Sequence, residues 1–103
     1  MKFLKCEVFI PDKDKLKLID ALSAGGFLSY GGYGEVYSES PVLGHFTPLA
    51  GSNPSLGTIG SHEIVNEVKV EFRIKKEDKD KVYEIIKKAH PYEVPVINFI
   101  DLV

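Results

Sequence analysis

The chain has 103 residues, of which 44% are hydrophobic and 27% are charged, and its formal net charge is -2. This length fits one domain of ordinary size, so we treat residues 1–103 as a single domain whose active site, if any, is small or shared between subunits. Nucleic-acid binding is disfavoured, because 15 acidic residues outnumber 13 basic ones and Arg73 is the only arginine.

The cellular setting is predicted from what the sequence lacks. No apolar stretch approaches the length of a membrane span. Near the start of the chain, apolar residues alternate with Lys and Glu, whereas a signal peptide has a continuous apolar segment. A single cysteine, Cys6, cannot form an internal disulfide, which fits a reducing compartment. We therefore expect a cytoplasmic protein with no membrane or nucleic-acid partner.

The first half of the chain predicts a strand, a helix and a second strand. Residues 3–10 alternate with the period of a strand, and the expected inward residues are Leu4, Cys6, Val8 and Ile10. A helix over residues 13–24, with Asp12 as its N-cap, follows, and its expected core residues are Leu16, Ile19, Leu22 and Phe27. Residues 33–40 predict a glycine-rich strand.

The second half begins with a long connection. Residues 41–61 are rich in Gly, Pro, Ser and Thr, and a loop of this length inside a small domain is usually functional. Residues 64–75 predict a strand whose inward residues are Ile64, Val68, Val70, Phe72 and Ile74. Residues 77–89 predict an amphipathic helix whose core stripe is Val82, Ile85, Ile86 and Ala89. Residues 93–103 predict a last strand that is apolar on both faces.

This order of elements predicts an α+β, ferredoxin-like βαββαβ sandwich, with a four-stranded antiparallel sheet and two helices on one face. The helices leave the other face of the sheet uncovered. Because the last strand is apolar on that face as well, we expect the sheets of several subunits to pack against one another in a homo-oligomer.

Two segments carry a family resemblance. Residues 44–60, GHFTPLAGSNPSLGTIG, resemble the G-x-F-x-P-L-x-G-x-N-P-x-x-G-x-x-G signature of the domain inserted into Nif-three-like proteins. Residues 89–93, AHPYE, are shared by those inserted domains and by CutA, and Val94 and Pro95 extend the match toward CutA. The chain thus resembles a stand-alone PII/CutA-like domain, which implies a ferredoxin-like core and a homotrimer. The large two-metal domain of Nif-three-like proteins has no counterpart in these residues.

A divalent metal ion is the one cofactor for which the sequence offers ligands. We take His90, Glu93 and His45 as the candidates, because imidazole and carboxylate groups bind divalent metals, and His62 is a further donor on the loop. A structural role for His90 at a helix C-terminus is the stronger interpretation, since one His and one Glu fall short of a closed site. A neighbouring subunit would have to supply the missing donors. Cys6 is predicted to be an unreactive core residue.

Candidate ligand-binding residues come from the same loop and motif. They are Tyr33, Phe46, Asn53, Gly57 and Tyr92. Neither standard phosphate-binding glycine motif is present, so no nucleotide site is predicted from the sequence. Turn formation is the ordinary role of the loop glycines, and packing is the ordinary role of Tyr92.

The functional expectation is a non-enzymatic, homotrimeric module. It would bind a small molecule or a divalent metal ion at the clefts between subunits, where the loop over residues 41–62 meets residues 89–93. Two alternatives stay open at this point. One is a small metal-assisted hydrolase that uses His90, Glu93 and a metal-bound water, and the other is a pure oligomerisation or partner-docking domain.

Overall fold

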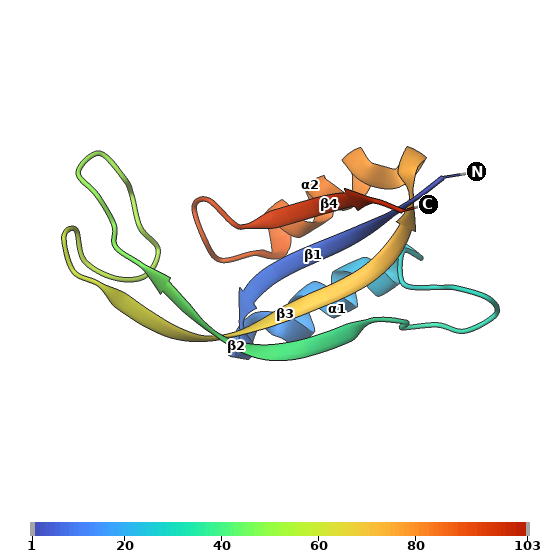
Figure 1. The fold of residues 1–103 in the computed structure, drawn as a ribbon, viewed down its shortest axis with the longest axis horizontal. Coiled ribbons are helices and arrows are strands. Elements are labelled where there is room, and N and C mark those ends of the chain that lie inside the picture. Colours follow the sequence, from blue (N-terminus) through green and yellow to red (C-terminus); the bar gives the residue numbers. More distant parts are fainter. Residues whose placement is uncertain (1, 103) are drawn as a thin grey trace.

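The computed structural model describes residues 2–102 as a four-stranded antiparallel sheet with two helices on one face (Figure 1). The elements are β1 (Phe3–Pro11), α1 (Lys15–Ala24), β2 (Ser38–Phe46), β3 (Glu63–Lys75), α2 (Lys79–Ala89) and β4 (Ile97–Asp101). The strand order is β2-β3-β1-β4, and each neighbouring pair is antiparallel. The predicted ferredoxin-like arrangement is therefore confirmed.

The core lies between the helices and the two central strands. Its members are apolar residues at alternate strand positions and at helical spacing, together with Leu28 after α1: Leu4, Cys6, Val8, Ile10, Leu18, Ile19, Leu22, Leu28, Val68, Val70, Phe72, Ile74, Val82, Ile86 and Ala89. The predicted inward face of β1 is confirmed at all four positions. Burial raises the pKa of the Cys6 thiol to about 12, as expected of an unreactive core cysteine.

The start of the first helix differs from the prediction. Asp12 is not the N-cap, because residues Asp12–Asp14 form a short 3-10 helix and α1 begins at Lys15. The tighter winding of this turn changes the phase of the helix relative to the core. Leu18 is buried in place of Leu16, whose side chain is 66% exposed.

The second strand also lies further along the chain than predicted. The glycine-rich segment before it turns back on itself through a bridge between Tyr30 and Tyr33, and Gly31 and Gly32 both have positive φ. Strand β2 then occupies residues 38–46, so the predicted loop begins later, at Thr47. Pro41 is accommodated because β2 is an edge strand, and the backbone groups on its outer edge pair with no other strand of the sheet.

Strand β3 passes from the helix-covered body into a two-stranded arm. Its pairing with β1 ends where Pro11 faces Glu67, whereas its pairing with β2 continues until Glu63 faces Phe46. We call residues 43–66 the arm, which comprises the ends of β2 and β3 and the loop between them, and which extends away from the helices in Figure 1. Because no helix covers it there, Ile64 is 61% exposed, and its predicted inward position is wrong.

The last strand is shorter than predicted. It covers residues 97–101, and the preceding segment, residues 90–96, contains two prolines that lack the N–H a strand needs. Ile97 and Phe99 pack against the core, whereas Val96 and Ile100 are exposed. Apolar side chains therefore face both sides of the sheet at this edge. Among residues 2–102, none of the helices is long and apolar enough to cross a membrane.

Candidate functional site

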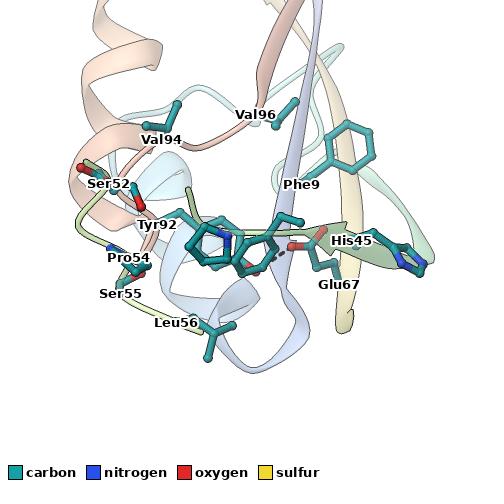
Figure 2. Close-up of a pocket in the computed structure, with 14 residues that line it drawn as sticks. Phe9, His45, Ser52, Pro54, Ser55, Leu56, Glu67, Tyr92, Val94 and Val96 are labelled. Carbon is teal, nitrogen blue, oxygen red and sulfur yellow. Dashed lines mark hydrogen bonds between the residues drawn. The ribbon is translucent and has the colours of Figure 1, made fainter. Parts of the chain in front are cut away.

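A cavity of about 260 Å³ lies at the base of the arm, where the 47–62 loop meets the 90–96 segment. Figure 2 shows its lining side chains, which come from five separate parts of the chain. Phe9 comes from β1, Phe46 from β2, Glu67 from β3, Leu56 from the loop and Tyr92 from the segment after α2. Pro91 and the end of α2 reverse the chain here, which brings the 90–96 segment back over the sheet.

Glu67 and Tyr92 form the polar base of the cavity. The Tyr92 hydroxyl donates a hydrogen bond to Glu67 Oε2 over 2.7 Å, the contact drawn as a dashed line in Figure 2. Glu67 is only 7% exposed, although its position in β3 is on the face opposite the core. Burial, together with the hydrogen bond to Glu67 and its charge, raises the pKa of Tyr92. The tyrosine therefore stays a neutral hydrogen-bond donor at physiological pH.

His90 holds Tyr92 in place through hydrogen bonds to the backbone on either side of it. Its Nε2 lies 2.6 Å from the Phe9 carbonyl oxygen, and its Nδ1 accepts the Tyr92 backbone N–H over 3.1 Å. Because a carbonyl only accepts, Nε2 must carry the proton, which fixes a neutral tautomer with both nitrogens in use. Burial lowers the pKa of His90, against the opposing effects of the Phe9 hydrogen bond and the charges of Glu67 and Asp14. These contacts fit the structural interpretation of His90 rather than a metal-binding one.

The proposed metal ligands do not converge within one chain. Glu93 Oε1 accepts the Asn53 backbone N–H over 3.0 Å, and His45 Nδ1 lies 3.0 Å from His62 Nε2. In the stretch that the structure describes, residues 2–102, no three His, Cys, Asp or Glu side chains are placed to hold a metal ion. His90 contacts the Phe9 carbonyl of β1, so the three candidate ligands have different partners.

The candidate ligand-binding residues divide into two groups. Phe46 and Tyr92 line the cavity, and the Asn53 amide ties the loop to Glu93 beside it. Gly57 shapes the loop instead, since its φ is +90° and an added Cβ would come within 2.7 Å of the Glu63 side chain. Tyr33 does not line the cavity: it is 75% exposed and pairs with Tyr30 at the glycine-rich turn.

Sequence reasoning did not name Glu67 as a site residue, although the polar base depends on it. The strand pattern placed it on the solvent-facing side of β3, and its hydrogen-bond partner, Tyr92, is 25 residues away in the sequence. Gly44 was the available signal, because a glycine inside a strand often marks a close approach by another group. A Cβ built at Gly44 would collide with the Glu67 carboxylate.

Comparison with solved structures first identifies the fold class. CutA from Archaeoglobus fulgidus superposes with a TM-score of 0.71 at 15% identity, over 97% of this chain and 83% of that chain. The Bacillus subtilis GlnK–ATP complex gives a TM-score of 0.65 at 18% identity, over 98% of this chain and 82% of that one. At these identities the likeness shows the CutA/PII type of ferredoxin-like fold and nothing further.

The more similar sequences are Nif3-related. A Bacillus cereus protein related to NIF3 superposes with a TM-score of 0.83 at 29% identity, over 98% of this chain and 26% of that chain. A protein of Staphylococcus aureus (strain COL) named GTP cyclohydrolase 1 type 2 homolog is 37% identical over 100 residues, which are 97% of this chain. The chain spans only 27% of the length of that relative. No protein-family model matches the chain. The predicted resemblance to a PII/CutA-like domain of Nif3-related proteins is confirmed.

Proposed function

We propose that this chain is a non-enzymatic, homotrimeric module that binds a small molecule in the cavity at the base of the arm. The observation that carries the proposal is the cavity itself, which is closed by a loop on one side and by the 90–96 segment on the other. Its lining combines apolar walls with a few fixed polar groups, as is typical of small-molecule sites. A small molecule fits this lining better than a resident metal ion, because both nitrogens of His90 are in use.

Ligand binding would change the position of the 47–62 loop, and a partner could recognise that change. Leu56 and its neighbours line one wall of the cavity, and the hydrogen bond from the Asn53 amide to Glu93 joins this loop to the opposite wall. A ligand that contacts both walls would hold the arm in one orientation. Ordering or reorienting a segment in this way is a common means of signalling to a partner.

Trimer formation would place the cavity beside a subunit boundary. Val94 and Val96 line the cavity and are largely exposed, and Ile100 continues the apolar surface along β4. Exposed apolar residues that continue along one sheet edge favour association with another copy of the chain. A neighbouring subunit seated there would close the open side of the cavity.

Native mass spectrometry of the freshly purified protein tests both parts of the proposal. We expect a trimer that carries extra mass in multiples of three, and we expect this extra mass to be lost in a Phe46→Ala variant. Leu49→Ala is the matched control, because Leu49 is an exposed loop residue that does not line the cavity. A trimer without bound mass, whatever the small molecules added, would favour a docking domain, and a monomer would contradict the assembly.

A further inference from the structure

We infer that the ligand of this cavity is a small organic cation, such as an alkylammonium group, held by the Glu67 carboxylate. This inference rests on the proposed function and adds the chemical class of the ligand. It follows from three properties of the lining: its charge, the burial of Glu67 and the arrangement of the aromatic rings.

The charged groups of the lining favour a cation. Two carboxylates, Glu67 and Glu93, line the cavity, and the lining contains neither lysine nor arginine. The imidazole of His45 reaches the cavity edge but forms a contact with His62, and in Figure 2 it is directed away from Tyr92. A phosphate or carboxylate ligand would therefore meet negative charge without a compensating cation.

Glu67 has an incomplete set of partners. The hydrogen bond from Tyr92 reaches Oε2, and within residues 2–102 the salt bridges involve other carboxylates. A buried carboxylate is costly unless it is paired with a cation or several donors. A ligand ammonium group would supply that missing charge and up to three N–H donors.

Gly44 leaves room for the carboxylate of Glu67. The atom nearest to a Cβ built at Gly44 is Glu67 Oε1, and the two would overlap. Any other residue at this position would cover the oxygen that Tyr92 does not use. The strand thus lets the carboxylate lie directly against the β2 backbone, next to the cavity, with no side chain of residue 44 between them.

The remaining walls suit a short apolar chain that carries the charge. The Phe46 and Tyr92 rings lie 5.9 Å apart between centroids at an angle of 56°, and Phe9 adds a third ring. Aromatic faces attract cations, most strongly where water is excluded. The cavity volume of about 260 Å³ admits a few carbon atoms in addition to the charged group.

The test compares three four-carbon probes of similar shape: butylammonium, 1-butanol and butyrate. Each is titrated into the 15N-labelled full chain, and the amide shifts of Gly44, Glu67 and Tyr92 are followed. We expect butylammonium to bind at least about tenfold more tightly than either other probe, the effect of one charge-assisted hydrogen bond. The preference should weaken as salt is added.

Two variants locate the effect at Glu67. Glu67→Gln removes the charge while keeping an acceptor for Tyr92, and it should abolish the tenfold preference. Glu84→Gln, on the exposed surface of α2, changes the net charge equally and should leave binding unchanged. If Glu67→Gln does not fold, Gly44→Ala, which crowds Oε1 without changing any charge, replaces it and should weaken butylammonium binding alone.

The outcomes separate this inference from the proposed function. Equal or tighter binding of butanol or butyrate in the same cavity overturns the cation inference but retains a ligand-binding module. If none of the three probes moves these amides at tens of millimolar, the cation inference is wrong, and the copurified mass then decides the proposed function. If butylammonium still causes the same amide shifts in the Glu67→Gln variant, the inference is also overturned.

Discussion

The body and the arm of this molecule use the same strand for different purposes. Over Val68–Ile74, alternate residues of β3 lie under the helices and are almost fully buried, whereas Ile64 on the same strand is exposed in the arm. The body obtains its stability from apolar packing between the sheet and the helices. The arm has no such layer, and it contacts the 90–96 segment through the Asn53–Glu93 hydrogen bond and the Phe46–Tyr92 ring contact.

The cavity lies at the boundary between these regions. Glu67 is the β3 residue that faces the last residue of β1, Pro11, so it is where the central pairing stops and the arm begins. The sheet fixes Glu67, and the loop supplies the opposite wall of the cavity through Leu56. Binding sites often combine a rigid element with a loop in this way, because affinity needs fixed groups and signalling needs a movable one.

A core truncation should give the largest difference between the two regions. Leu22→Ala removes a fully buried side chain from α1 and should lower the free energy of unfolding by about 2–5 kcal/mol. Leu49→Ala removes the same atoms from a side chain that is 71% exposed, so a change within about 0.5 kcal/mol is expected. Urea denaturation of the two variants measures the contrast, and equal losses would contradict the division into body and arm.

Removal of the Tyr92 hydroxyl should have the next largest effect. Tyr92→Phe leaves the Glu67 carboxylate without its hydrogen-bond donor and should cost about 1–3 kcal/mol of stability. Tyr83→Phe is the control, because Tyr83 is a partly exposed residue on the surface of α2. A Tyr92→Phe protein as stable as its parent would mean that water replaces the hydroxyl at Glu67.

Acid should weaken the junction through His90. Burial lowers the pKa of His90 in the folded protein, so the unfolded chain binds this proton first and stability falls as pH drops below about 6.5. The contribution of one group cannot exceed about 1.4 kcal/mol per pH unit. Unfolding curves between pH 7 and pH 5 measure the pH dependence of the unfolding free energy in the parent and in His90→Gln, and the difference is the contribution of His90. The Gln side-chain amide can still donate to the Phe9 carbonyl. An identical pH slope in the two proteins would contradict the assignment.

The contact between the loop and Glu93 should give the smallest effect. Glu93→Ala removes the acceptor for the Asn53 N–H, so hydrogen exchange at this amide should become about two- to threefold faster. Glu93→Gln keeps an acceptor oxygen and should exchange at nearly the parental rate. Equal exchange rates in all three proteins would show that the hydrogen bond to Glu93 does not protect the Asn53 amide.

Most of the body was predictable from the sequence, because local periodicity and burial agree there. The alternation of β1 identified all four inward residues, including Cys6. Of the four residues in the predicted stripe of α2, Val82, Ile86 and Ala89 are buried and Ile85 is half-buried against the core. The error at the start of α1 arose from the 3-10 turn over Asp12–Asp14, which no residue pattern distinguishes from a first helical turn. The shift of β2 arose because glycines occur both in weak strands and in turns.

The site was predictable only in outline. The motif resemblance brought the loop and residues 89–93 together, and Phe46 and Tyr92 do line one cavity. Tyr33 lies apart from this cavity because the glycine-rich turn places it at the opposite end of β2. Glu67 was not predicted as a site residue because its burial depends on contacts that form only after folding, and such contacts leave no local period in the sequence.

The single thiol gives this chain an internal reporter of opening. Cys6 lies in the middle of a central strand, is fully buried, and is the only cysteine in the sequence. A thiol-specific reagent can reach it only when β1 separates from the helices. For an unfolding free energy of about 5 kcal/mol, its alkylation would be several thousandfold slower than in the unfolded chain. Motions of the arm alone would leave this rate unchanged, so the same sulfur distinguishes loop movement from loss of the fold.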